Sequence, residues 1–226
     1  MFERSKHWKT ASFPLLHKPH LCNFWKMPQL LIATKNAHKT QEIGAMLGAA
    51  WDLTDLCAHP EIPAPEETGS TFVQNATIKA LEASRLFPGW VLADDSGLSV
   101  DALGGAPGIL SARYAGPQAS DAQNRALVLE RLAAFPEDYQ RTARFSCVMA
   151  LAQSGEIKAL FHGIVEGRLL SEEQGSGGFG YDSLFVPDGH SDSFGVLSAE
   201  QKNSISHRAR ALTAFQRWIA ANASLL

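Results

Sequence analysis

Structural cysteines, membrane segments and repeats are all scarce in this 226-residue chain. Its three cysteines, Cys22, Cys57 and Cys147, stand far apart and form no Cys-x-x-Cys pair. This spacing argues against a structural zinc site and a disulfide framework, and it is typical of a reducing compartment. No apolar run approaches the roughly 18 residues that a membrane-spanning helix needs. We therefore expect a cytoplasmic globular protein with no membrane partner.

Positive charge is also scarce over most of the chain. There are 20 basic and 23 acidic side chains, which give a net charge of −3. Residues 1–28 hold five of the basic side chains and one acid, so residues 29–226 carry a charge of −7. An acidic body argues against a broad basic surface for nucleic acid. It still allows a small anionic ligand that is held by a few lysines and a metal ion.

The composition changes near Met27. Residues 1–28 mix aromatic, proline, histidine and lysine residues without a period, and they lack the apolar core and cleavage site of a signal peptide. We expect an N-terminal extension over 1–28 that is disordered or reflects a non-native start; a transit peptide fits less well because serine and arginine are few. The remaining residues, 29–226, are enough for a single domain with a sizeable core.

Strand and helix patterns alternate along residues 29–226. We expect strands at 29–33, 90–93, 142–153, 157–166 and 181–186, with a hairpin turn at Ser154-Gly155. Helices are expected from 37 to about 48, from Ser70 or Thr71 to about 87, from 120 to about 134, and near the C-terminus after a capping box at Ser198 and Gln201. Alternation with an added hairpin indicates an α/β fold with a mixed sheet.

The first polar cluster follows the first strand, with Thr34, Asn36 and Lys39 at the turn into a helix. A hydroxyl, an amide and an ammonium group at such a turn suit a polyphosphate, since helix N-termini favour anions. The alternative is that Thr34 only caps the helix and that Lys39 is solvated. The cluster is not a P-loop, because the Gly-x-x-x-x-Gly-Lys spacing is absent.

Two carboxylate pairs form the next clusters. Glu66 and Glu67 precede the second helix, and Asp94 and Asp95 follow the strand that ends at residue 93. Carboxylates so placed can hold a divalent metal and deprotonate water, with Lys79 as a phosphate-binding group. The alternatives are a favourable charge at a helix N-terminus, a polar turn after a strand, and a solvated lysine.

The last cluster lies in the C-terminal third. Phe179 stands between two glycines that leave its ring free to stack on a base, and Asp182 accepts hydrogen bonds nearby. Lys202, His207 and Arg208 donate hydrogen bonds, so they can read carbonyl oxygens on a base. The alternative is that the serine before His207 caps the last helix, that His207 and Arg208 are surface residues, and that Phe179 belongs to the core.

Together these segments resemble the inosine triphosphate pyrophosphatase family, whose members act on non-standard purine nucleoside triphosphates. The match runs in order from about Gln29 to the C-terminus. One departure is Ser183, where the family pattern often has proline. The resemblance is carried by the following segments: 34–39 (TKNAHK), 66–69 (EETG), 75–80 (NATIKA), 93–98 (ADDSGL), 104–108 (GGAPG), 111–114 (SARY), 178–182 (GFGYD) and 206–208 (SHR).

The resemblance implies hydrolysis of ITP, dITP and XTP to the monophosphate and pyrophosphate with Mg²⁺, which would clean deaminated purines from the nucleotide pool. It implies an elongated, two-lobed α/β fold around a long mixed sheet with flanking helices. The nucleotide would lie in the cleft between the lobes, and a homodimer is the usual state of the family.

The resemblance and the residue types together suggest roles for individual side chains. Asp95 is expected to be the base that activates water and also a metal contact. Glu67 is expected to be the second metal ligand, and Glu66 is the alternative to Glu67 in that role. The remaining candidates are substrate-binding residues. The triphosphate would be held by Thr34, Lys35, Asn36, Ala37, His38, Lys39, Lys79 and Ser96. The base and sugar would be bound by Phe179, Gly180, Tyr181 and Asp182. The carbonyl of the base would be bound by Lys202, His207 and Arg208.

Base selection follows from hydrogen-bond chemistry. Hypoxanthine and xanthine carry a carbonyl at C6, where adenine carries an amino group, so buried donors there favour the deaminated bases by ~1–3 kcal/mol each. Guanine shares the carbonyl, so donors at this position do not reject it. Two alternatives stay open: a pyrophosphatase for other modified nucleotides, and a nucleotide-binding sensor without turnover.

Overall fold

The computed structural model describes residues 27–136 and 141–225. Nearly all of the expected extension, residues 1–28, and with it Cys22, therefore lies outside the described residues. The strands are β1 (Gln29–Ile32), β2 (Asp52–Asp55), β3 (Trp90–Val100), β4 (Thr142–Gln153), β5 (Glu156–Leu169) and β6 (Phe185–Pro187). The α-helices are α1 (Ala37–Leu47), α2 (Phe72–Ser84), α3 (Asp121–Leu132), α4 (Ala199–Ile205) and α5 (His207–Ala221).

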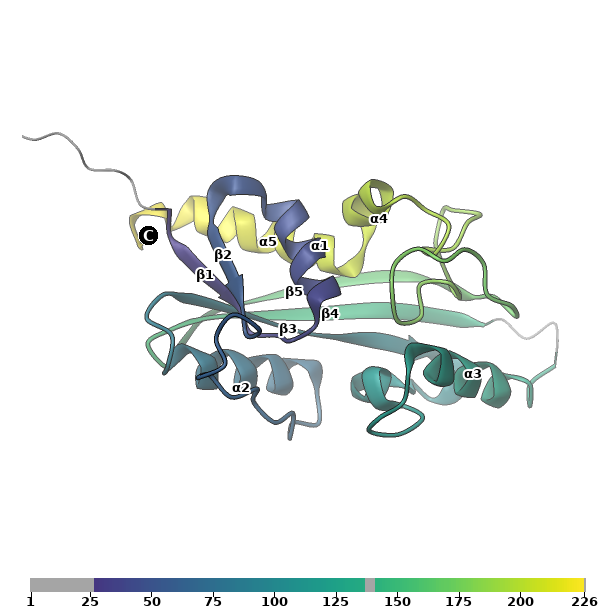
Figure 1. Ribbon diagram of the computed structural model, residues 1–226. Coiled ribbons are helices and arrows are strands. Elements are labelled where there is room, and N and C mark those ends of the chain that lie inside the picture. The colour runs from purple at the N-terminus through teal and green to yellow at the C-terminus, as the bar shows by residue number, and fades with distance from the viewer. Residues whose placement is uncertain (1–26, 137–140, 226) are drawn as a thin grey trace, which may run out of the picture.

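The six strands form one mixed sheet in the order β2-β1-β3-β4-β5-β6. β1 pairs in parallel with β2 and β3, and every later pairing is antiparallel. The long strands β3, β4 and β5 run along the elongated molecule, with α1 and α5 over one face and α2 and α3 over the other (Figure 1). The predicted α/β fold with a long mixed sheet and flanking helices is confirmed.

Apolar stripes at helical spacing fix each helix to its face of the sheet. Ala76, Ala80 and Ala83 of α2 are fully buried, and their small side chains let the helix lie close to β3 and β4. On the opposite face, Leu212 and Phe215 of α5 are buried against the sheet. A third cluster joins α3 to the far ends of the long strands.

The prediction of a turn at Asp94-Asp95 is wrong, because β3 continues through both aspartates to Val100. The antiparallel pairing with β4 has no break there, with Asp94 opposite Met149 and Asp95 opposite Val148. Neighbouring backbone bonds on β4 therefore override the low strand propensity of aspartate.

Two further strand predictions need correction. The expected strand 181–186 is confined to Phe185–Pro187, because residues 181–184 form turns in which Leu184 N donates to Tyr181 O. β2 was missed, since its sequence Asp-Leu-Thr-Asp shows no apolar alternation. It is an edge strand that forms by parallel pairing with β1.

Turn and cap signals were read correctly. The β4–β5 hairpin turns at Ser154 and Gly155, with φ of 53° and 78°. The capping box at Ser198 is present, and the C-terminal helical region divides into α4 and α5 at Ser206, whose hydroxyl accepts from Ala209 N. No helix in the ranges 27–136 and 141–225 is both long and apolar enough to cross a bilayer.

Candidate active site

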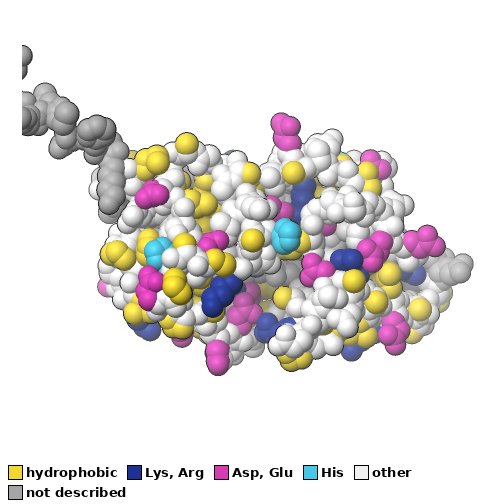
Figure 2. All heavy atoms as spheres, in the orientation of Figure 1, with side chains coloured by type: hydrophobic (Ala, Val, Ile, Leu, Met, Phe, Trp, Pro, Cys, Tyr) yellow, Lys and Arg dark blue, Asp and Glu magenta, His cyan; other side chains and the backbone are white. Residues whose placement is uncertain are grey.

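A pocket opens where the chain leaves β1 for α1. β1 ends at Ile32, while β3 continues beside it, and Ala33 N donates to Leu92 O at the last point of contact. Asp94 and Asp95 follow Leu92 and Ala93 on β3, so they lie in the crevice beyond the carboxyl end of parallel strands. Ligands of α/β sheets bind in such crevices. In Figure 2 this face is hollowed near its middle, and acidic and basic side chains surround the hollow.

Asn36 organises the start of α1. Its Oδ1 accepts from His38 N at 3.0 Å and from Lys39 N at 3.4 Å, so Asn36 and not Thr34 is the N-cap. Thr34 Oγ1 instead accepts from Asn36 N at 3.1 Å. Lys39 is half-buried and forms an ion pair with Asp94, so the alternative of a solvated lysine is wrong.

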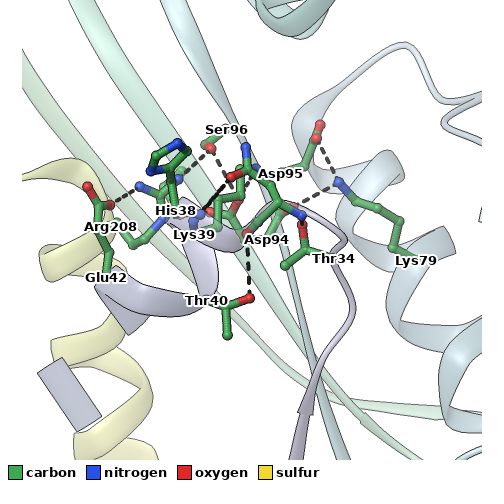
Figure 3. A network of polar contacts seen from close by, with 12 residues as sticks. Thr34, His38, Lys39, Thr40, Glu42, Lys79, Asp94, Asp95, Ser96 and Arg208 are labelled. Carbon is green, nitrogen blue, oxygen red and sulfur yellow. Dashed lines mark hydrogen bonds and ion pairs between the residues drawn. The ribbon is translucent and has the colours of Figure 1, made fainter. Parts of the chain in front are cut away.

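Asp94 is a fully enclosed anion that links the sheet to both C-terminal and N-terminal segments. Its carboxylate accepts hydrogen bonds from Lys39, from Ser96 Oγ at 3.2 Å and from Cys147 Sγ at 3.0 Å, and Arg208 Nε lies 3.4 Å away. Burial alone would raise the pKa of Asp94, but Arg208 and Lys39 together hold it well below its usual range. Asp94 is therefore ionised, and its lowered pKa makes it a weaker base than an ordinary carboxylate. Figure 3 shows this network between β3, α1 and α5.

Asp95 has the opposite character although it is the next residue. Lys79 Nζ donates to Asp95 Oδ1 at 2.9 Å, whereas Asp95 Oδ2 is buried and has no hydrogen-bond partner among the described residues. Burial raises the pKa of Asp95 to about 6, with a further rise from the charge of Glu67, against the lowering effect of Lys79. A carboxylate with a free oxygen and a pKa near neutrality suits a general base.

Glu67 completes this cluster from the loop before α2. Its Oε1 accepts from Lys79 at 2.7 Å and its Oε2 from Arg113 at 2.9 Å. Burial opposes ionisation, but Lys79 and Arg113 lower the pKa of Glu67 to about 2. Lys79 is buried on α2, so the alternative of a solvated lysine is again wrong. Glu66 is exposed and does not line the pocket.

The opposite end of the pocket is aromatic. The half-buried ring of Phe179 stacks on His38, with centroids 5.3 Å apart and planes at 14°. Lys202 Nζ lies 4.9 Å from the centre of the Phe179 ring and is fixed by Glu42 and Asp182, both at 2.6 Å. Asp182 also accepts from Phe179 N at 2.8 Å. The Phe179 ring therefore lies beside charged side chains whose positions are fixed by ion pairs and hydrogen bonds.

His207 and Arg208 begin α5 inside the protein and are not surface residues. His207 is buried and stacks on Phe145 with centroids 4.7 Å apart. Burial and the neighbouring Arg208 hold the pKa of His207 well below its usual range, so the imidazole is neutral. Arg208 is 1% exposed and donates to Glu42 Oε2 at 2.5 Å and to Ser96 Oγ at 3.0 Å.

The structure brings most of the predicted site residues to one pocket, and Thr34, Lys35, Ala37 and Glu66 do not line it. Lys79 acts through its contacts with Asp95 and Glu67, and His38 borders an adjoining groove. The predicted residues that line the pocket are Asn36, Lys39, Glu67, Asp95, Ser96, Phe179, Gly180, Tyr181, Asp182, Lys202, His207 and Arg208.

Sequence reasoning missed Glu42, Phe145 and Asp121, and it gave Asp94 no role. Glu42 joins α1 to Lys202 and Arg208 across 160 and 166 positions of sequence, and no local pattern marks such a pairing. Phe145 has the alternation of a core strand residue, and Asp121 reads as a favourable charge in the first turn of a helix.

The donor set fits a hard divalent cation such as Mg²⁺. No group of three or more His, Cys, Asp or Glu side chains with metal-site geometry occurs in residues 27–136 and 141–225. Mg²⁺ keeps several waters and needs only one or two carboxylates. The carboxylates of Asp95 and Glu67, which Lys79 bridges at 2.9 and 2.7 Å, supply oxygen donors of this kind, whereas the sulfur of the buried Cys147 bonds to Asp94.

A pocket with paired carboxylates and lysines at one end and an aromatic ring among hydrogen-bond donors at the other defines a nucleotide-binding protein with hydrolytic groups. The model of the Ham1 family matches residues 30–218, and the chain belongs to this family. This membership confirms the resemblance drawn from the sequence.

The matches to named relatives cover almost the whole length of each relative. A dITP/XTP pyrophosphatase from Exiguobacterium sibiricum is 46% identical over 81% of this chain and 93% of the relative. Another, from Halalkalibacterium halodurans, is 45% identical over 85% of this chain and 100% of the relative. A solved structure of a HAM1 protein from Coxiella burnetii superposes with a TM-score of 0.77 at 39% identity, covering 86% of this chain and 100% of that one.

Proposed function

We propose that this protein hydrolyses the triphosphates of deaminated purines, ITP, dITP and XTP, to the monophosphate and pyrophosphate. The observation that carries the proposal is that Asp95, with its free oxygen and raised pKa, lines the same pocket as the Phe179 ring and the donor Lys202 beside it. Relatives at about 45% identity carry the name dITP/XTP pyrophosphatase, which supports the same chemistry.

The reaction needs one proton acceptor and one leaving group. A water molecule attacks the α-phosphorus, and its proton passes to Asp95 Oδ2. The bond from the α-phosphorus to the oxygen that bridges it to the β-phosphorus breaks, and pyrophosphate leaves with that oxygen. Lys79 holds Asp95 through Oδ1, which keeps Oδ2 directed to the water. Lys39, at the start of α1, offsets the charge that builds on the phosphates.

Asp95 and Glu67 would hold Mg²⁺. The ion would supply charge compensation for the phosphate oxygens and make a nearby water more acidic. Lys79 bridges the same two carboxylates at 2.9 and 2.7 Å. The ammonium group keeps the two anions close together, so the pair is already assembled for a cation.

Base selection rests on fixed donors. Lys202 and Arg208 are buried cations that cannot accept a hydrogen bond, and their ion pairs with Glu42 keep them in place. A carbonyl at C6 accepts from their remaining N–H groups, whereas the amino group of adenine leaves those N–H groups unpaired at ~1–3 kcal/mol each. The neutral His207 contributes at most one ring N–H to this recognition.

The deciding experiment is pyrophosphate release from ITP, XTP, GTP, ATP and dUTP, with and without Mg²⁺. We expect Mg²⁺-dependent turnover of ITP and XTP, lost in Asp95→Asn and retained in the exposed control Asp188→Asn. Turnover of a different nucleotide would reassign the substrate to another modified base. Tight ITP binding without pyrophosphate release would identify a sensor and refute hydrolysis.

The proposal includes a homodimer in the cytoplasm. The resemblance supports the dimer, and the few, widely spaced cysteines support a reducing compartment. Cys57 and Cys147 are both free thiols. Sedimentation at micromolar concentration tests the dimer, and fractionation of the source cells tests the compartment. A monomer over the whole concentration range, or recovery in an oxidising compartment, would refute the respective part.

A further inference from the structure

Two residues of α3 hold the segment that carries Phe179. Asp121 Oδ2 accepts from Gly180 N at 2.7 Å, and Arg125 Nη1 donates to Gly180 O at 2.8 Å. Positions 121 and 125 are four residues apart, so they lie on one face of the helix. Both polar backbone groups of Gly180, directly beside the aromatic ring, are therefore fixed by the same turn of α3.

Arg125 also reaches the other end of the same loop. Its Nε lies 2.9 Å from Glu173 Oε2, and that oxygen accepts from Ser183 Oγ at 2.9 Å. The Arg125 side chain is 18% exposed, compared with 43% for Glu173, so the arginine is the inner member of the pair. α3 thus brackets the stretch between residues 173 and 180 at both ends.

The bracketed stretch contains no helix or strand, and its backbone contacts neighbouring segments at Gln174, whose N donates to Ser183 O at 2.8 Å, and at Gly177, whose N donates to Gly195 O at 2.9 Å. Residues 171–178 are all exposed, and Gly175, Gly178 and Gly180 have φ of 78°, 71° and 62°. Glycines lose more conformational freedom than other residues when a chain is fixed. A base that stacks on Phe179 would have to order this loop on binding, unless other contacts have already done so.

The segment that carries Phe179 also lies between the pocket and a neighbouring groove. Asp121, Phe179, Gly180 and Asp182 line both the pocket with Asp95 and an adjoining groove beside the glycine-rich loop. A displacement of Gly180 therefore changes the shape of the base end of the pocket. The start of α1, which faces the phosphates, is a separate segment with its own cap at Asn36.

We propose that Asp121 and Arg125 are positioning residues that pre-order the Phe179-Gly180 peptide for stacking on the purine. The inference rests on the proposed function, because it assigns Phe179 to the base. The pair acts on the base half of the substrate and leaves the triphosphate half unchanged. Its signature is therefore a loss of affinity that depends on the presence of a base.

The test measures binding of the two halves to the full chain by calorimetry, with inosine monophosphate as the base-bearing half and inorganic tripolyphosphate as the other. In Asp121→Ala and Arg125→Ala, inosine monophosphate is expected to bind about tenfold more weakly, the equivalent of one lost hydrogen bond. Tripolyphosphate affinity should stay unchanged. The KM for ITP should rise more than kcat falls.

Two variants provide controls. Asp121→Asn keeps an oxygen that can accept from Gly180 N, so it should bind inosine monophosphate like the parent. Arg131→Ala removes an arginine from the same helix, whose Nη1 contacts Tyr114 Oη and not the loop, and it should change neither ligand.

Equal weakening of both ligands, or unchanged inosine monophosphate binding in both alanine variants, would overturn the positioning role. The ratio of the affinity for inosine monophosphate to the affinity for tripolyphosphate is measured without turnover. A parent protein that binds both halves but releases no pyrophosphate from ITP refutes the proposed function alone, and the ratio still decides the role of Asp121 and Arg125.

Discussion

Replacing Asp95 with asparagine should stabilise the protein while it abolishes turnover. Burial raises the pKa of Asp95 from the ordinary 3.8 to about 6, and its side chain is only 8% exposed. At about 1.4 kcal/mol for each pKa unit, ionisation of Asp95 is about 3 kcal/mol harder in the folded protein than in the unfolded chain. Asparagine resembles the protonated carboxyl in size and shape and never ionises, so the variant avoids this destabilisation.

The effect has a defined dependence on pH. Between about pH 4 and 6 the unfolded chain has released the Asp95 proton and the folded protein still holds it, so the parent loses stability as the pH rises. The advantage of Asp95→Asn over the parent should therefore grow from about 1 kcal/mol near pH 4.5 to about 3 kcal/mol near pH 7.5 and then stay level.

Urea denaturation of the metal-free protein at several pH values measures this difference. The matched control is Asp188→Asn, which alters an exposed aspartate after β6 and should change stability by less than about 0.5 kcal/mol. If Asp95→Asn is less stable than the parent at pH 7.5, or if the difference does not vary with pH, the assignment of a raised pKa to a proton-accepting Asp95 is refuted.

Two further variants test the neighbouring charges. Glu67→Gln should show the opposite sign: the pKa of Glu67 is lowered to about 2, so its stabilisation is present above about pH 4.5 and is lost as the pH falls toward 2. Because the Glu67 side chain is 27% exposed, we expect a loss of only about 1–2 kcal/mol at pH 7, by the same urea assay, and a gain there would contradict the prediction. Arg208→Ala removes one of the two cations that face each of the carboxylates Glu42 and Asp94 and should cost about 3–5 kcal/mol, whereas a loss below about 1 kcal/mol would show that Lys202 and Lys39 suffice for them.

Local patterns were sufficient for much of the fold. The glycine after Ser154 predicted the hairpin turn, and Ser120 and Ser198 predicted helix starts, because turn and cap preferences depend on neighbouring residues only. The same local reasoning failed for Asp94 and Asp95, where strand pairing with β4 decides the conformation.

The different roles of the adjacent residues Asp94 and Asp95 show more clearly what sequence reasoning alone does not predict. The sequence by itself determined that two aspartates follow an apolar strand, that glycines flank Phe179, and that the chain resembles the inosine triphosphate pyrophosphatase family. Only the tertiary structure decided that Asp94 is a fixed anion and Asp95 a free acceptor. Burial and distant partners set ionisation: Lys39 and Arg208 surround Asp94, whereas Asp95 meets Lys79 on one oxygen alone. Those partners come from three helices, and no local pattern records which carboxylate each of them will reach.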